Sequence, residues 1–265
     1  NSMATLRSRK VFDFRVGRQA RMARVSGANC GRQAVDAAEF DGFAEQYEAQ
    51  HRANIAITGE SPDYFARYKI VELRRLADAA GVTANRLIDF GSGIGNSLPH
   101  LRERFPETAV ACADVSRRSL ELAKARFPGR EQTLEIEGER IPAPEASFDV
   151  AFSACVFHHI PHEEHVRWMS ELHRVVRPGG LLAIFEHNPL NPLTLRAVNT
   201  CPFDVNARLI RAGVLARRMR EGGWREVSVR YHIFLPRAAA ALRGVEPYLG
   251  WLPVGAQYAV SGRRR

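Results

Sequence analysis

The sequence predicts an α/β protein with a mostly parallel β-sheet and helices on both of its faces. Between residues 86 and 186, apolar runs of strand length alternate with longer segments of helical period. Such alternation is typical of strand–helix–strand units, which place their strands in parallel. The run at residues 86–90 leads directly into a glycine-rich loop, the usual form of a tight strand-to-helix turn. A chain of 265 residues is long enough for one large domain of this kind.

The individual elements follow from apolar spacing and from the residues at their ends. A helix over residues 63–80 is expected after the Ser-Pro-Asp start at residues 61–63, and Gly81 ends it. An earlier helix within residues 36–57, which includes Tyr47, is indicated by the helical spacing of its aromatic residues. The expected strands of the alternating region are residues 86–90, 109–114, 133–137, 148–153 and 180–186. The helices expected between and after them are residues 96–105, 116–127, 163–176 and 207–222.

The last part of the chain completes this pattern. Pro178-Gly179-Gly180 predicts a tight turn that leads into the strand at residues 180–186. Residues 225–234 and 256–261 are rich in β-forming residues and are expected to add two strands.

The glycine loop is the most informative feature of the chain. Gly91, Gly93 and Gly95 follow the first strand, and glycine is needed where a backbone turns sharply or touches a ligand. Asp114, at the end of the second strand, can accept hydrogen bonds from ribose hydroxyls. The pattern predicts a nucleoside-containing cofactor at the carboxyl edge of the sheet.

The loop differs from the dinucleotide fingerprint G-x-G-x-x-G. Its glycines are spaced G-x-G-x-G, and Asn96 stands where the third glycine would fall. Asp89, just before the loop, suits an amine or a cation and would repel a pyrophosphate. These two features disfavour a nicotinamide-dependent oxidoreductase.

Six segments in a set order carry a family resemblance. They are residues 87–97, 113–116, 137–142, 147–152, 158–160 and 177–182. As an ordered set they closely resemble the class I S-adenosylmethionine-dependent methyltransferases. The resemblance implies a Rossmann-like methyltransferase fold with a mostly parallel seven-stranded sheet, in which the last two strands form a C-terminal antiparallel pair. It also implies S-adenosyl-L-methionine as cofactor and S-adenosyl-L-homocysteine as product.

The resemblance assigns roles in cofactor binding. Asp89 is expected to hold the methionine amine, Asp114 to hold the ribose hydroxyls, and Val115 to lie against adenine. Contact with the adenine amine is assigned to Glu137, with the backbone of Gly138 beside it. Because this chain has Ile-Glu where the family usually has Gly-Asp, Glu139 is the alternative. The complete expected cofactor set is Asp89, Gly91, Ser92, Gly93, Asn96, Asp114, Val115, Glu137, Gly138, Glu139 and Ser153.

The methyl acceptor is expected between the carboxyl ends of the strands at residues 148–153 and 180–186, because ligands of open α/β sheets bind there. Methyl transfer from a sulfonium is an in-line displacement, which needs alignment and exclusion of water. A base is needed only if the acceptor keeps its proton near neutral pH. The candidate catalytic residues are His158, His159, Glu186 and His187, with capping or packing as the alternative for each.

A metal site is disfavoured by the same region. His158, His159, His162 and His165 are close in sequence, but Pro161 interrupts them and no carboxylate or cysteine set accompanies them. We expect a solvated helix start here and metal-independent transfer.

Three further segments have open roles. Residues 188–192 and 201–204 form either a lid or a rigid surface connection, and Tyr47 lines either the pocket or the core. The aromatic segment at residues 247–253 is an acceptor-pocket cover, a homodimer contact or a membrane-surface contact.

The net charge of +9 is concentrated at the beginning of the chain. Residues 1–35 hold eight arginines and lysines against one aspartate, so the remaining residues carry a net charge of only +2. Enzymes that act on nucleic acid usually need a basic groove, so the near-neutral charge of residues 36–265 favours a small-molecule acceptor. Oxygen is the preferred acceptor atom, followed by nitrogen.

Residues 1–35 are expected to be a disordered basic arm, an added helix or strand, or a targeting segment. Residues 36–265 are expected to be a single methyltransferase domain whose helical cap covers residues 36–81.

The cysteines and apolar runs bear on location. The four cysteines lack a C-x-x-C pair, which fits reduced thiols in the cytoplasm, and no apolar run reaches the length of a membrane span. Two other functions stay open: a non-catalytic S-adenosylmethionine-binding protein, and an RNA methyltransferase that uses the basic arm.

Overall fold

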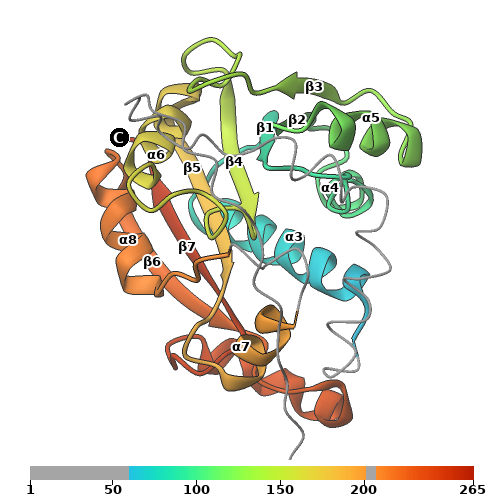
Figure 1. Ribbon diagram of the computed structural model, residues 1–265, viewed down its shortest axis with the longest axis vertical. Helices are drawn as coiled ribbons and strands as arrows, with labels where there is room; N and C mark the ends of the chain where they lie inside the picture. The colour runs from blue at the N-terminus through green and yellow to red at the C-terminus, as the bar shows by residue number, and fades with distance from the viewer. Residues whose placement is uncertain (1–59, 201–206) are drawn as a thin grey trace, which may run out of the picture. The chain divides into compact units, whose positions relative to one another are not determined.

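The computed structural model describes residues 60–200 and 207–265, which form a seven-stranded sheet flanked by helices (Figure 1). The strands run in the order β3-β2-β1-β4-β5-β7-β6. Their bounds are Arg86–Phe90 (β1), Ala109–Asp114 (β2), Gln132–Glu135 (β3), Phe148–Ala154 (β4), Val176–His187 (β5), Arg225–His232 (β6) and Gln257–Arg263 (β7). The helices are Pro62–Ala79 (α3), Leu98–Arg104 (α4), Arg117–Arg126 (α5), His165–Val175 (α6), Pro192–Asn199 (α7) and Ala212–Glu221 (α8), with a 3₁₀ segment η3 at Arg237–Leu249.

The topology of the sheet confirms the predicted fold. Strands β1 to β5 pair in parallel, and β7 pairs antiparallel with both β5 and β6. The direction of strand order reverses between β1 and β4, and such a switch point is where open α/β sheets bind ligands. The carboxyl ends of β1, β2, β4 and β5 therefore meet at one edge, together with the start of β7.

Helices cover both faces of the sheet, as predicted. On one face, α3, α4 and α5 pack with Leu87, Phe152 and Phe185. On the other face, α6 and α8 pack with Ile88 and Ile184. Neighbouring residues of a strand point to opposite faces, so each buried strand contributes to two separate hydrophobic clusters.

Two element bounds differ from the prediction by more than two residues. Strand β5 begins at Val176, and the Pro-Gly-Gly sequence lies within it as a bulge, where Gly179 has φ +81°. The predicted tight turn is therefore wrong; an irregular strand satisfies the backbone instead, since the Gly179 N–H donates to Arg264 O at 2.6 Å. Helix α8 begins at Ala212 rather than at residue 207, because Ile210 is buried and its carbonyl accepts a hydrogen bond from Tyr258.

The segment after β5 contains a helix that the sequence analysis did not predict. Asn191 accepts hydrogen bonds from the backbone of Leu193 and Thr194, and Pro192 occupies the first helical position of α7. The Asn-Pro pair is thus a helix start. The expected helix at residues 36–57, Tyr47 and residues 201–204 lie outside the described residues. No helix in the described part of the chain is long and apolar enough to cross a membrane.

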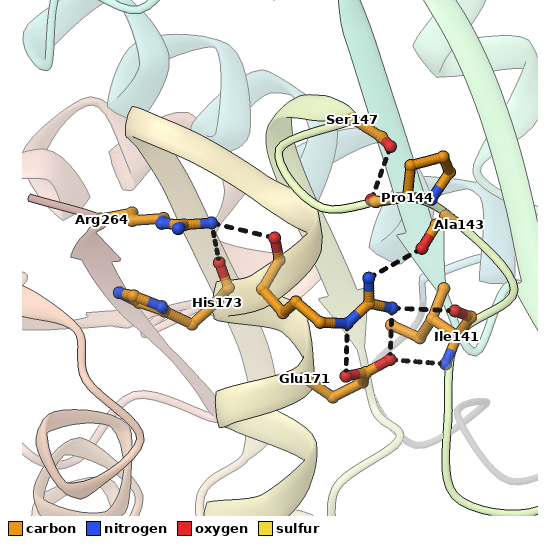
Figure 2. A network of polar contacts seen from close by, with 8 residues as sticks. Ile141, Ala143, Pro144, Ser147, Glu171, His173 and Arg264 are labelled. Atoms are coloured by element: carbon orange, nitrogen blue, oxygen red, sulfur yellow. Dashed lines mark hydrogen bonds and ion pairs between the residues drawn. The ribbon is translucent and has the colours of Figure 1, made fainter.

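A polar network fixes the opposite, amino-terminal edge of the sheet (Figure 2). The Glu171 carboxylate accepts the N–H of Ile141 at 2.9 Å, and Arg174 donates to the carbonyls of Ile141 and Ala143. Arg264 donates to the carbonyl of His173 at 2.8 Å. These contacts attach the connection before β4 to α6, so this edge is structural and the carboxyl edge is left for ligands.

Candidate active site

The glycine loop folds against the end of β2. The N–H groups of Gly91 and Ser92 both donate to Ala113 O, at 2.7 and 3.1 Å. A Cβ on Gly91 would lie 2.3 Å from the side chain of Val156, so this glycine permits close packing with the loop after β4. A Cβ on Gly93 would meet no protein atom within 4 Å, although its φ of +51° favours glycine. The loop is therefore open on the side of Gly93, where a ligand has room.

Asp114 holds this loop in place. Its Oδ2 accepts the N–H of Gly93 at 2.8 Å, and its Oδ1 accepts the N–H of Ser116 at 2.9 Å. The carboxylate is largely buried beside the opening at Gly93. A carboxylate oxygen can accept more than one hydrogen bond, which is the chemistry needed to accept ribose hydroxyls. The ribose role of Asp114 stays a prediction that this geometry fits.

Replacing Asp114 by alanine is expected to weaken binding of S-adenosylhomocysteine by about 1–3 kcal/mol, the usual loss for hydrogen bonds to a charged group. Part of that loss would come from release of the Gly93 N–H. Calorimetric titration measures the change, and an unaltered affinity would refute the ribose assignment.

Asp89 is a buried carboxylate with an unused acceptor. Its side chain is only 2% exposed and its Oδ2 has no hydrogen-bond partner. Burial, helped by the negative charge of Asp114, raises the pKa of Asp89 from its ordinary 3.8 to about 7. A buried acceptor without a partner is costly unless a ligand supplies the donor. An aliphatic ammonium such as the methionine amine of S-adenosylmethionine fits this position in charge and hydrogen bonding.

Cofactor affinity is expected to depend on pH through Asp89. An ammonium beside the carboxyl favours its ionised form, so binding below pH 7 releases a proton. Affinity should therefore rise with pH by up to about tenfold per unit, from about pH 5 to about pH 7, and level off above. Titration calorimetry across this range checks the slope. Asp89→Asn should flatten it; a slope that survives the substitution would belong to another group.

The other expected cofactor residues differ in exposure and contacts. Val115 is half-buried against the core, and Glu137 and Gly138 are exposed, with open space at Gly138. Glu139 pairs with Arg167 of α6, so its charge is engaged by the protein.

Three polar residues of the expected set have contrasting surroundings. The side-chain oxygen of Asn96 accepts a hydrogen bond from Arg126 at 3.0 Å, which braces the loop against α5. Ser92 and Ser153 are buried, and neither hydroxyl has a hydrogen-bond partner among the described residues. Both hydroxyls therefore have hydrogen-bonding capacity that a ligand could use, Ser92 in the glycine loop and Ser153 near the end of β4.

Glu186 and His158 form a buried pair on the other side of this edge. Glu186 Oε2 lies 2.5 Å from His158 Nδ1, while its Oε1 accepts the N–H groups of Val156 at 3.1 Å and Phe157 at 2.7 Å. Both side chains are 1% exposed. Burial would raise the pKa of Glu186, but the charge and hydrogen bond of His158 lower it overall. Contact of Glu186 with the acceptor stays a prediction; in this structure its carboxylate binds the backbone of the loop after β4 and contacts His158.

The histidines after β4 are not a solvated helix start, so that expectation is wrong. His158 and His165 are buried, and the rings of His159 and His187 lie 4.2 and 5.3 Å from that of His158. Burial lowers the pKa of His165 to about 4, and its two nitrogens contact Ile160 O and the Arg218 guanidinium. Among the described residues, no three His, Cys, Asp or Glu side chains gather as a metal site would require.

A row of polar side chains crosses three strands on the face covered by α3. His187, Gln257 and His232 are paired in register across β5, β7 and β6. Tyr68 of α3 donates to Gln257 Oε1, and Gln257 Nε2 lies 3.3 Å from His187 Nδ1. Apart from His187, this row was not predicted, because only the strand register and the position of α3 bring these residues together.

Cys155 follows β4 directly and was also missed. Its backbone has φ +59°, which is strained for a side chain with a Cβ, and strain of this kind is common at functional sites. Burial raises the pKa of its thiol, but His187 and Lys69 outweigh this effect and lower it to about 7. Cys155 thus marks an electropositive position at the end of β4.

The fold and the site together define a class of protein: a Rossmann-like α/β domain whose carboxyl edge suits a nucleoside-containing ligand with an amine group. Comparison with known proteins identifies the class more closely. A family model described as "Methyltransferase domain" matches residues 88–184. These residues form a class I S-adenosylmethionine-dependent methyltransferase domain, which confirms the family, the fold and the cofactor predicted from the sequence.

The relatives of this chain are named methyltransferases. The demethylmenaquinone methyltransferase of Deinococcus radiodurans is 29% identical over 116 residues, which are 43% of this chain and 47% of the relative. The trans-aconitate 2-methyltransferase of an Azoarcus species is 34% identical over 142 residues, 53% of this chain and 52% of the relative. The chain thus matches about half the length of these relatives. A SAM-dependent methyltransferase structure from Thermotoga maritima shares the fold with a TM-score of 0.61 at 19% identity, covering 86% of this chain and 99% of the other.

Proposed function

We propose that this protein transfers a methyl group from S-adenosylmethionine to a small-molecule acceptor, at oxygen in preference to nitrogen and without a metal ion. The observation that carries the proposal is the unpaired Asp89 carboxylate oxygen next to the open side of the glycine loop at Gly93. In a methyltransferase domain these two features suit the methionine amine and the adjoining part of the cofactor.

The residues of the chain contribute mainly by placement. Asp89 would bind the amine, Asp114 the ribose, and the half-buried Val115 the adenine. The bound cofactor supplies an electrophilic methyl group on a positively charged sulfur. The ends of β4 and β5 would place the acceptor in line with that methyl group, and His158, held by Glu186, would keep the wall of the site in one shape. Alignment and exclusion of water are the main demands of such a displacement.

Two observations favour a small acceptor. The relatives are named for a demethylated quinone and for aconitate, both small molecules. Residues 36–265 carry a net charge of only +2, which does not suit a phosphate backbone. A cytoplasmic location, a homodimer and a single domain over residues 36–265 accompany this proposal as further predictions.

Calorimetric titration with S-adenosylmethionine, S-adenosylhomocysteine and NAD tests the proposed function first. Micromolar binding of the first two without NAD, followed by turnover in an acceptor screen, is the expected result. Cofactor binding without turnover of any acceptor would favour a non-catalytic binding protein. Salt-sensitive RNA binding that is lost on removal of residues 1–35 would favour an RNA methyltransferase.

A further inference from the structure

Lys69 is a buried lysine on a helix that faces the sheet. It follows Phe65 and precedes Leu73 and Ala77 at helical spacing, so it occupies a position of the apolar stripe of α3. Lys69 as a whole is only 7% exposed. Within residues 60–200 and 207–265, it makes no hydrogen bond or ion pair, and its ammonium lies 5.6 Å from the centre of the Tyr68 ring.

A buried ammonium without an anion is unfavourable. Lysine is almost never fully buried unless it is paired, because removing the charge from water costs several kcal/mol or more. A cation–π contact with Tyr68 offsets only about 1–2 kcal/mol of this. Glu186, a buried carboxylate of this edge, already accepts three hydrogen bonds from other groups. Among the described residues no carboxylate pairs with Lys69, and the Cys155 thiol is the group whose negative charge it favours. A carboxylate partner for Lys69 would therefore come from a ligand.

The surroundings of Lys69 place that anion near the end of β4. Lys69 acts on the thiol of Cys155, the first residue after β4. Its neighbour Tyr68 contacts Phe185 of β5 and donates to Gln257 at the start of β7. The ammonium thus belongs to the part of the carboxyl edge formed by β4, β5 and β7.

This part of the edge differs from the part where the cofactor amine would bind. Asp89 lies on β1, and β4 and β5 are the next two strands in the sheet. Strands are spaced by about 4.8 Å, so the two regions are separated by roughly 5 to 10 Å. Lys69 would therefore be reached by a group of the acceptor, which lies beyond the transferable methyl, and not by the methionine end of the cofactor.

We propose that Lys69 binds a carboxylate of the methyl acceptor, so that the substrates of this protein are small carboxylic acids. This inference rests on the proposed methyltransferase function and specifies its substrate class. Tyr68, Gln257 and His187 would fix the polar wall on which the acid lies.

The chemistry of such an acceptor agrees with the structure. A carboxylate oxygen forms the bond to the methyl carbon, the carbon–sulfur bond breaks, and its electron pair goes to sulfur. The products are a methyl ester and a neutral thioether, and no proton moves. A carboxylic acid is ionised at neutral pH, so no general base is required. His158 Nδ1 is engaged by Glu186, and a reaction of this kind requires no proton transfer from His158.

The test compares Lys69→Met with Lys69→Arg and wild type. Methionine keeps the length and apolar stem of the side chain without its charge, so the fold should persist. Each variant is titrated with trans-aconitate, fumarate and benzoate, and with their amides, in the presence of saturating S-adenosylhomocysteine. We expect wild type to bind at least one acid at least about tenfold more tightly than its amide, and Lys69→Met to lose this preference. Lys69→Arg should retain part of it.

A second readout follows the thiol of Cys155 by alkylation with iodoacetamide and peptide mass spectrometry. The bound acid should slow alkylation in wild type, and Lys69→Met should react more slowly than wild type at pH 7 because its thiol is less ionised. Equal affinity for acids and amides, no binding of any acid, or retention of acid binding by Lys69→Met would overturn the inference. A fall in S-adenosylhomocysteine affinity in Lys69→Met would assign the lysine to the cofactor and overturn it as well. Failure of wild type to bind S-adenosylhomocysteine would instead refute the proposed function.

Discussion

Valine in place of Gly93 is expected to abolish detectable binding of S-adenosylmethionine. The position has φ +51°, where a β-branched residue is strained, and its N–H is held by Asp114. A valine side chain would meet no protein atom near its Cβ and would instead occupy the space on the open side of the loop. We expect a loss of at least about 3 kcal/mol, which is more than a hundredfold in Kd. Titration calorimetry gives the affinity directly.

Gly213 provides a matched control for this substitution. It is an exposed glycine in α8, and a Cβ there also meets nothing within 4 Å. Gly213→Val should leave cofactor affinity unchanged and should not reduce the melting temperature, because valine is a better helix former than glycine. If Gly93→Val bound S-adenosylmethionine normally while its fold was intact, the ligand would not lie on this side of the loop.

The cofactor half of the site was predictable because its residues lie next to one another in local patterns. The end of β1, the glycine loop and the end of β2 each form a short motif, and parallel strands must bring their carboxyl ends to one edge. Asp89 and Asp114 follow from these patterns alone. What the patterns did not predict is that Asp89 lacks a partner for one oxygen, since this depends on which side chains bury it.

The acceptor half was only partly predictable. Glu186 and His187 are neighbours in sequence, but alternation along β5 sends them to opposite faces of the sheet, and only the packing of α3 and α6 decides what each face contains. Gln257 joins the site through its register with His187, a pairing of residues 70 positions apart. Lys69 did leave a signal: a lysine within the apolar stripe of an amphipathic helix is out of place in a core.

Glutamine in place of Glu186 is expected to lower acceptor turnover by about 10²-fold while cofactor affinity stays within about twofold. Glu186 supplies acceptors to three donors at once: the N–H groups of Val156 and Phe157 and the ring of His158. The amide of glutamine has one acceptor oxygen and presents an NH₂ group in place of the other. If its oxygen stays with the two backbone donors, its NH₂ faces His158 Nδ1 and forces the imidazole into the other tautomer. The wall of the acceptor site then shifts, and in-line alignment is lost.

Glu171→Gln separates this effect from a general loss of stability. Glu171 also accepts a backbone N–H and anchors a loop, but at the opposite edge of the sheet (Figure 2). Both variants should lose about 1–3 kcal/mol of unfolding free energy in chemical denaturation, since each replaces a charged acceptor of hydrogen bonds. Only Glu186→Gln should lose turnover, because only its loop lines the carboxyl edge. Equal losses of turnover in both variants would show that Glu186 acts through stability alone, and a loss of cofactor affinity as large as the loss of turnover would place it in the cofactor site instead.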